Sequence, residues 1–190
     1  AQNKIRLVLC GRRLERLKEL QKELEKITDV TILQFDVRNK EAVFNAIKSL
    51  PESFKQIDIL INNAGNAHGL SSIQDGDTDD WDAMLDINVK GLLYVSKAII
   101  PNMTERNSGF ILNIGSIAGK EVYPNGNVYC ASKYAVNALN KGMRIDLNKH
   151  NIRVCAIHPG AVETEFSEVR FKGDKEKAKG VYSGYKALQA

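Results

Sequence analysis

Short apolar runs rich in β-branched residues alternate along the chain with longer amphipathic segments. The runs predict five strands, at Ile5–Cys10, Val30–Phe35, Ile57–Ile61, Phe110–Ile114 and Arg153–Ile157. Each run is nearly continuous in apolar residues rather than strictly alternating, which is typical of parallel strands buried on both faces.

The segments between these runs have helical periodicity. In the first, Leu14, Leu17, Leu20, Leu24 and Ile27 recur at steps of three and four residues, giving one apolar stripe on a charged helix. Three more helices are predicted: Lys40–Leu50, a helix from Thr78 towards Arg106 with a break near Pro101, and one from Asn127 to His150. This alternation predicts a three-layer α/β/α fold with a parallel sheet, in one domain over residues 1–190.

The start of the chain departs from a complete doubly wound dinucleotide-binding sheet. Such a sheet begins with a strand, a Gly-rich turn and a helix N-terminus. Here Gly11-Arg12-Arg13 follows the first predicted strand, and no Gly-rich cluster precedes it. With the usual strand order 3-2-1-4-5-6, the absent strand is the central one. Two strands on one side and three on the other would then have no hydrogen-bonded neighbour between them. We therefore expect a longer chain, cut within its first helix at Ala1-Gln2-Asn3 and again after Ala190.

Composition and charge narrow the class of protein. The 190 residues are 43% hydrophobic and 26% charged, with a net charge of +4 that is not gathered into a basic arm, so nucleic acid is not an expected partner. No apolar stretch approaches the ~20 residues of a membrane span. The three cysteines are widely spaced, which disfavours disulfides and structural zinc and favours a cytoplasmic location.

Tyr129 and Lys133 lie four residues apart at the start of a predicted helix, so they share one face. A lysine cation one turn away favours the phenolate and lowers the tyrosine pKa, which would make the pair a general acid or base near neutral pH. Alone, this spacing also fits an ordinary surface pair.

Other polar residues follow the predicted strands. Ser116 comes just after Phe110–Ile114, and Asn62-Asn63-Ala64-Gly65 follows Ile57–Ile61. In an open parallel sheet the ligand crevice lies beyond the carboxyl ends of the strands. Each feature alone also fits a helix cap or an Asx turn. Asn88 lies inside a predicted helix, where Asn is a mediocre helix former unless its side chain is exposed or hydrogen-bonded.

Two further strand ends complete this pattern. Asp36-Val37 ends the second strand, where the aspartate would accept a hydrogen bond from an amino group or cap the next helix. Pro159-Gly160-Ala161-Val162-Glu163-Thr164 follows the last strand, as a turn or as a backbone-rich wall against a cofactor. An ordinary turn or helix cap explains each of these groups alone. It does not explain why they lie together at the ends of the strands.

This constellation resembles the short-chain dehydrogenase/reductase family, in its compact single-domain Rossmann-fold members. The resemblance rests on Asn62-Asn63-Ala64-Gly65, Asn88, Ser116, Tyr129-x-x-x-Lys133 and Pro159-Gly160-x-x-x-Thr164, which span nearly the whole chain. The family's glycine motif is the one conspicuous departure. The sequences around Ile117-Ala118-Gly119, Tyr123–Lys133 and Val162–Asp174 look like the branch of NADP-dependent 3-hydroxy-acid dehydrogenases, which includes serine 3-dehydrogenase, L-allo-threonine dehydrogenase and malonic semialdehyde reductase.

The resemblance implies roles for the four central residues. Tyr129 would exchange a proton with the substrate hydroxyl, and Lys133 would lower the tyrosine pKa and bind the nicotinamide ribose. Ser116 would donate to the substrate oxygen, and Asn88 would hold a water that links Lys133 to solvent. The same resemblance implies that the cofactor is contacted by Arg12, Arg13, Asp36, Val37, Asn63, Ala64, Gly65, Tyr129, Lys133, Pro159, Gly160, Val162 and Thr164.

Charge favours NADP over NAD. An NAD site places an acid at the end of the second Rossmann strand, whereas an NADP site needs a cation there. Cys10-Gly11-Arg12-Arg13 offers two guanidiniums and no acid. These suit a 2′-phosphate, although a solvated helix end has the same composition.

The substrate is expected to be a small hydroxy or oxo acid such as serine, L-allo-threonine or 3-hydroxypropionate. Its carboxylate needs a cation, and Arg170 is the candidate, with a plain surface arginine as the alternative. Cys130 is expected to be a packed small residue, and His68, His150 and His158 are too scattered for a metal site. Apolar positions such as Leu92, Leu93, Val136 and Leu139 look exposed, so a homodimer or homotetramer is expected.

Two other functions remain open. The chain would also suit a related reductase of another carbonyl, such as a 3-oxoacyl thioester or a cyclic ketone. The absent glycine loop motivates a non-catalytic nucleotide-binding scaffold, against which the joint presence of Asn88, Ser116, Tyr129 and Lys133 argues.

Overall fold

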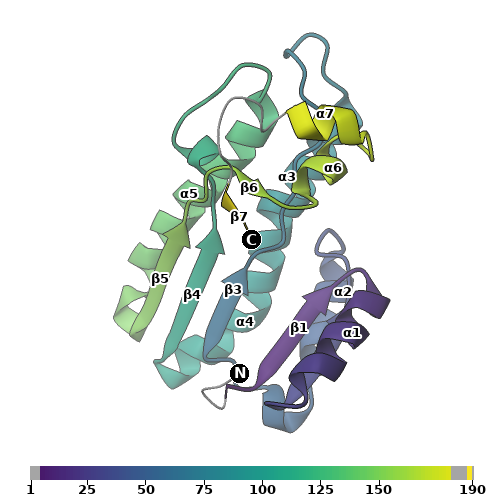
Figure 1. Ribbon diagram of the computed structural model, residues 1–190. Helices are drawn as coiled ribbons and strands as arrows, with labels where there is room; N and C mark the ends of the chain where they lie inside the picture. Colours follow the sequence, from purple (N-terminus) through teal and green to yellow (C-terminus); the bar gives the residue numbers. More distant parts are fainter. Residues whose placement is uncertain (1–4, 181–187, 190) are drawn as a thin grey trace.

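Five of the seven parallel strands in the described part of the chain form two separate sheets flanked by helices, and the other two, which are short, pair as a third sheet. The computed structural model of the protein describes residues 5–180 and 188–189. One sheet pairs β1 (Leu7–Gly11) with β2 (Val30–Gln34). The other has the order β3 (Ile59–Asn62), β4 (Gly109–Ile114) and β5 (Ile152–Ile157). As predicted, two strands lie on one side and three on the other (Figure 1). The points at which a longer chain was expected to be cut, at residues 1–3 and after residue 190, lie outside the described residues.

The helices are close to the predicted ranges. The principal ones are α1 (Leu14–Leu24), α2 (Lys40–Lys48), α3 (Thr78–Leu85), α4 (Leu92–Arg106) and α5 (Asn127–Leu147). The predicted break near Pro101 is wrong, because α4 continues through this residue. The backbone bond that Pro101 removes would end on the carbonyl of Lys97, and both residues are exposed, so this interruption lies on the solvent side of the helix.

A six-residue π-helical segment, η2 (Asp86–Gly91), joins α3 to α4 without a loop. The residues of this turn follow i→i+5 hydrogen bonding, which hydrophobic periodicity does not reveal. The predicted single helix is therefore three consecutive segments.

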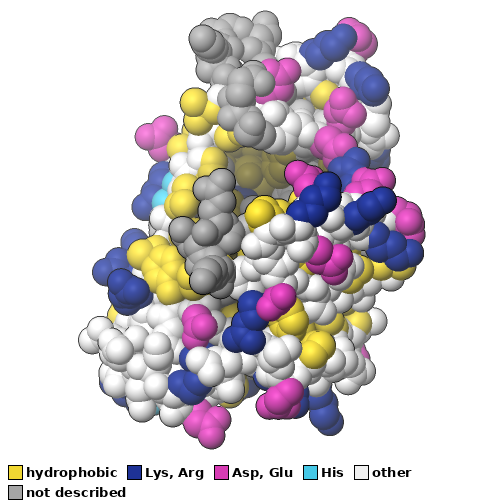
Figure 2. Space-filling model, turned by 60° about the horizontal axis from the view of Figure 1, so that its bottom comes forward, with side chains coloured by type: hydrophobic (Ala, Val, Ile, Leu, Met, Phe, Trp, Pro, Cys, Tyr) yellow, Lys and Arg dark blue, Asp and Glu magenta, His cyan; other side chains and the backbone are white. Residues whose placement is uncertain are grey.

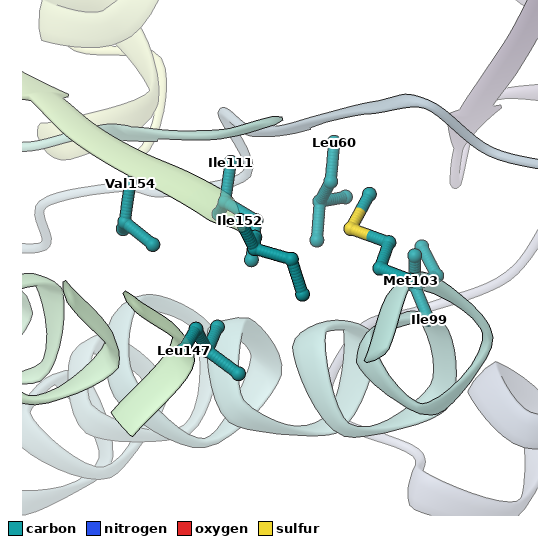
Figure 3. Close-up of a cluster of buried hydrophobic side chains, with 7 residues drawn as sticks. All are labelled: Leu60, Ile99, Met103, Ile111, Leu147, Ile152 and Val154. Carbon is teal, nitrogen blue, oxygen red and sulfur yellow. The ribbon is translucent and has the colours of Figure 1, made fainter. Parts of the chain in front are cut away.

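The main core lies between the three-stranded sheet and the helices α4 and α5, which lie behind the strands in Figure 1. Seven buried apolar side chains form it: Leu60, Ile99, Met103, Ile111, Leu147, Ile152 and Val154 (Figure 3). A second cluster around Leu33, Phe35, Val43 and Leu50 holds α2 against β2.

The other face of the three-stranded sheet is more open than predicted. Ile59, Ile61 and Ile157 are 50%, 56% and 51% exposed, so β3 and β5 are not buried on both faces within the described residues. Leu92 and Val136 are buried, which corrects their expected exposure, whereas Leu93 is 38% exposed. Among the described residues, no helix is long and apolar enough to cross a membrane.

The remaining elements lie beyond the carboxyl ends of β4 and β5. They are η3 (Ile117–Gly119), β6 (Val162–Glu163), α6 (Phe166–Arg170), α7 (Lys175–Gly180) and β7 (Leu188–Gln189). Two short 3-10 turns lie elsewhere in the fold: η1 (Glu52–Phe54) precedes β3, and η4 (Asn148–His150) precedes β5. The segment with β6 and α6 lies above the ends of the strands in Figure 1, where it borders the candidate site.

Candidate active site

Tyr129, Lys133, Ser116 and Asn88 are brought together at the carboxyl ends of the strands. Tyr129 and Lys133 come from the first two turns of α5, Ser116 precedes η3, and Asn88 belongs to η2. Their exposed fractions are 9%, 6%, 9% and 1%. Four polar groups in a buried position need defined partners, and each of them has one.

Ser116 is held by the turn that begins at its own position. It is the N-cap of η3, and its Oγ accepts a hydrogen bond from the Ala118 backbone N–H at 3.1 Å. The turn packs closely on α5, since a Cβ added at Gly119 would lie 2.6 Å from the Lys133 carbonyl oxygen. Glycine at this position therefore lets η3 approach the helix that carries Tyr129.

The Lys133 ammonium group lies in the protein interior. Its Nζ donates to the Ile114 carbonyl oxygen at 3.1 Å and lies 6.0 Å from the centre of the Tyr129 ring. Burial lowers the pKa of Lys133 to about 8, because a charged ammonium loses its hydration there.

The expected lowering of the Tyr129 pKa is not found. Burial of the phenol raises its pKa, which outweighs the opposing effects of the Ser116 hydrogen bond and the Arg170 charge. The expectation was wrong because the phenol loses its own hydration on burial, and the neighbouring lysine directs its hydrogen bond to the Ile114 carbonyl instead of to the phenol. In this structure Tyr129 is a protonated phenol at neutral pH.

The Asn88 side chain ties the loop after β3 to α5. Its Oδ1 accepts from the Asn66 backbone N–H at 2.8 Å, while its Nδ2 donates to the Asn66 carbonyl at 2.8 Å and to Ser132 Oγ at 2.9 Å. Ser132 Oγ in turn donates to the Tyr129 carbonyl at 2.7 Å. The π-helical turn thus directs an amide that fixes both the loop after β3 and the start of α5.

Asn66 and Ser132 were not found from the sequence. Asn66 contributes mainly its backbone, for which side-chain chemistry gives no signal. Ser132 lies between Tyr129 and Lys133 at the interior face of α5 and is fully buried. The sequence feature that could have identified Ser132 is a small hydroxyl residue on the buried side of a predicted helix.

Arg170 is a buried residue of the site, so the alternative of a surface arginine is wrong. It is 6% exposed, and its guanidinium lies 5.8 Å from the ring centres of both Tyr123 and Tyr129. Nε donates to the Gly69 carbonyl at 2.8 Å and Nη1 to Tyr123 Oη at 3.2 Å. The Gly69 N–H donates back to the Arg170 carbonyl at 2.9 Å, which joins the β3 loop to α6.

A small cavity adjoins these groups. It has a volume of about 20 Å³, enough for roughly one water molecule, and is bordered by His68, Asp80, Tyr129 and Arg170 among others. Burial lowers the pKa of His68, so this imidazole is neutral at pH 7. The cavity therefore adds hydrogen-bonding groups beside Tyr129.

The arginines expected to select the cofactor already face carboxylates. Arg12 lies 3.9 Å from Asp36, which Arg38 also binds through paired contacts of 2.7–3.1 Å. Arg13, the N-cap of α1, lies 3.2 Å from Glu165. The α2 helix is capped by Asn39 rather than by Asp36. On the face shown in Figure 2, basic and acidic side chains are likewise interspersed around a hollow.

Most of the other expected cofactor residues lie at the carboxyl ends of β3 and β5. Asn63, Ala64 and Gly65 follow β3, and Pro159, Gly160, Val162 and Thr164 follow β5, while Val37 packs against Gly91. A Cβ at Gly65 would lie 3.2 Å from Asn88 Oδ1 and 3.4 Å from Lys133 Nζ. Cations at one end and a backbone wall beside Lys133 at the other fit a phosphorylated dinucleotide.

The turns after β4 and β5 are joined at this edge. Gly115 N–H donates to the Ile157 carbonyl at 2.8 Å and Ile117 N–H to that of Pro159 at 3.1 Å. The His158 Nδ1 lies 3.1 Å from the Ser116 carbonyl oxygen. Cys130 is fully buried, as expected for a packed residue. Within residues 5–180 and 188–189, no group of three His, Cys, Asp or Glu side chains is placed to hold a metal ion.

Comparisons with known proteins identify the family. The short chain dehydrogenase family matches residues 1–175. The NADP-dependent 3-hydroxy acid dehydrogenase YdfG of Escherichia coli K12 is 46% identical over 184 residues, which cover 96% of this chain and 73% of that protein. The NADP-dependent 3-hydroxy acid dehydrogenase of Schizosaccharomyces pombe is 42% identical over 97% of this chain and 72% of its own length.

Solved structures agree with this result. The closed form of a serine dehydrogenase complexed with NADP+ superposes with a TM-score of 0.92 at 45% identity, covering 99% of this chain and 75% of that one. A serine dehydrogenase from Escherichia coli gives a TM-score of 0.80 at 36% identity, covering 100% of this chain and 87% of that one. The helix-flanked parallel sheets, the family match over residues 1–175 and the 46% identity over 96% of the chain show that this chain belongs to the short-chain dehydrogenase family.

Proposed function

We propose that this protein is an NADP-dependent oxidoreductase that interconverts the 3-hydroxyl and 3-oxo groups of a small hydroxy acid. The observation that carries the proposal is the buried cluster of Tyr129, Ser116 and Lys133, with the Arg170 guanidinium 5.8 Å from the Tyr129 ring. The names of the relatives, 3-hydroxy acid dehydrogenase and serine dehydrogenase, support the same reaction class.

Tyr129 is the proton donor and acceptor of the proposed reaction. Because burial keeps its phenol protonated at neutral pH, the side chain is ready to give a proton to the alkoxide oxygen in the reductive direction. In the oxidative direction it must first lose that proton, and the Ser116 hydrogen bond and the Arg170 charge favour this loss. Ser116 donates to the same substrate oxygen and stabilises its developing charge.

NADP(H), when bound, supplies or accepts the hydride. Arg12 and Arg13 bind its 2′-phosphate, and Lys133 binds the ribose hydroxyls beside Gly65. Asp36, Val37, Asn63, Ala64, Pro159, Gly160, Val162 and Thr164 provide the remaining contacts. Asn88 acts through its ties to Asn66 and Ser132 and holds the water that links Lys133 to solvent.

Arg170 is proposed to bind the substrate carboxylate. Its guanidinium is buried among the rings of Tyr123, Tyr129 and Phe171, where an anion would be strongly attracted. Serine, L-allo-threonine and 3-hydroxypropionate are the proposed substrates, because each carries a carboxylate and a 3-hydroxyl. The intact protein is proposed to be a homodimer or homotetramer, and the free thiols of Cys10, Cys130 and Cys155 support a reducing compartment such as the cytoplasm.

A panel of substrates tests the proposal. The intact protein is assayed with NADP+ and NAD+ against the three acids, a 3-hydroxyacyl thioester and a cyclic alcohol. Highest kcat/KM with NADP+ and one of the acids is expected. Preference for the thioester or the cyclic alcohol would assign the protein to another carbonyl, and no turnover with any of them would favour a non-catalytic scaffold.

A further inference from the structure

Glu165 connects the arginines at the start of α1 to the segment that borders the active site. Arg16 binds it through two contacts, Nη1–Oε2 at 2.8 Å and Nη2–Oε1 at 2.5 Å, whereas Arg13 makes a single contact of 3.2 Å. The paired Arg16 contacts have the fork geometry of a strong guanidinium–carboxylate interaction. Arg16 is therefore the anchor of Glu165, and Arg13 is its more readily exchanged partner.

The Glu165 carboxylate is ionised throughout the working pH range. The hydrogen bonds from Arg16 and Arg13 lower its pKa to about 2. It is placed at the N-cap of α6, one residue after Thr164. A negative charge is thus fixed beside a guanidinium that is proposed to receive a 2′-phosphate, which itself carries about two negative charges.

We infer that Glu165 is a specificity-determining residue, which competes with the 2′-phosphate for Arg13 and so limits the preference for NADP over NAD. The inference rests on the proposed use of NADP. When the 2′-phosphate binds, Arg13 turns from Glu165 to the phosphate, and Arg16 keeps the carboxylate and the start of α6 in place. The three side chains are 53–63% exposed, so the exchange costs little.

The preference is measured as the ratio of the dissociation constants of NAD+ and NADP+, by calorimetric titration of the intact protein without substrate. In Glu165→Gln we expect the ratio to rise about two- to fivefold, the range for one exposed ion pair. The matched control is Glu168→Gln, which removes the same charge three residues further along, inside α6, at an exposed position with no ion pair among residues 5–180. That variant should leave the ratio unchanged.

Arg16→Gln provides a second test with the opposite sign. Without Arg16, Glu165 pairs with Arg13 alone, so the ratio of the dissociation constants should fall below the wild-type value. Adding Glu165→Gln to this variant should raise the ratio to that of the single Glu165→Gln variant. An unchanged ratio in Glu165→Gln, or an equal rise in Glu168→Gln, would overturn the inference. If the wild-type protein binds NAD+ as tightly as NADP+, the proposed cofactor choice fails instead.

Discussion

The Lys133 ammonium lies 6.0 Å from the centre of the Tyr129 ring, and its hydrogen bond goes to the Ile114 carbonyl rather than to the phenol. Both side chains are buried, and burial raises the pKa of Tyr129 while it lowers the pKa of Lys133 to about 8. Each group is thereby shifted towards its uncharged form. We therefore expect Tyr129 to determine how turnover depends on pH, and Lys133 to determine how the free energy of unfolding depends on pH.

Replacing Tyr129 with phenylalanine should remove the proton transfer while leaving the fold in place. We expect kcat to fall by about 10²–10⁴-fold, the usual contribution of general acid–base catalysis. The dissociation constant of NADPH, measured by fluorescence titration, should change less than about twofold, since the ring remains. Appreciable residual turnover would contradict the assignment of Tyr129.

Lys133 should reduce stability at neutral pH. Its folded-state pKa lies below the unfolded value, so the unfolded chain binds more protons between about pH 8 and pH 10.5. The cost of burying the cation is complete below pH 8 and is lost as pH rises towards 10.5. Lys133→Met should therefore raise the free energy of unfolding at pH 7 by at most about 3 kcal/mol.

Urea unfolding at pH 7 and at pH 10 checks this. The advantage of Lys133→Met should shrink strongly at the higher pH, while turnover is lost at both. Lys141→Met, at an exposed position of the same helix, is the control and should have no such pH-dependent effect. A destabilised Lys133→Met at pH 7 would show that its bond to Ile114 outweighs the burial cost.

The two reaction directions should respond to pH in opposite ways. Oxidation needs the ionised phenol, so its kcat/KM should rise about tenfold per pH unit below the apparent pKa of Tyr129. Reduction needs the neutral phenol and should decline only in the alkaline range. Profiles measured from pH 6 to pH 10.5 check both trends, and parallel profiles would argue against a tyrosine as the titrating group.

Asn88 should contribute to stability as well as to activity. Asn88→Ala leaves both Asn66 backbone groups without their partner, at about 1–3 kcal/mol for each buried group, while the Ser132 hydroxyl loses one bond and keeps the one to the Tyr129 carbonyl. Thermal and urea unfolding should show a loss of at least about 2 kcal/mol. Ser132→Ala, which removes one of these bonds, should cost less, and equal losses would locate the effect in Ser132 alone.

Arg170→Ala should affect acids more than neutral alcohols. Loss of a charge-assisted contact is worth about 1.5–3 kcal/mol, so KM for the hydroxy acid should rise roughly 10–100-fold. KM for a neutral secondary alcohol should change far less, although the lost Gly69 bond affects both substrates equally. Arg144→Ala, an exposed arginine on α5, is the control. An equal rise for acid and alcohol would leave Arg170 as an anchor of the loop only.

Strand positions and the residues at their carboxyl ends could be predicted because burial and chain direction determine them. The meeting of Ser116, Tyr129 and Lys133 follows directly from that arrangement. The partners of these residues could not be predicted, because they depend on backbone groups and distant side chains. The Asn88 bonds to Asn66, the buried position of Arg170 and the Glu165 contacts with Arg13 and Arg16 are of this kind.

The Tyr129 pKa was mispredicted for a related reason. Sequence spacing shows that a charge is near, but the direction of the shift depends on how much water each group loses. The continuity of α4 through Pro101 and the π-helical turn at Asp86–Gly91 were likewise set by local hydrogen bonding. The pattern of hydrophobic residues along the chain does not indicate such local hydrogen bonding.

The π-helical turn has a consequence for how this segment can vary. The wider turn changes the angular phase between α3 and α4, so that Met84 in the first and Leu92, Ser96 and Ile99 in the second all face the interior. Deleting one residue would restore a regular helix and rotate the buried stripe of α4 by about 100° relative to α3. We therefore expect this stretch to accept substitutions at its exposed positions but no insertion or deletion.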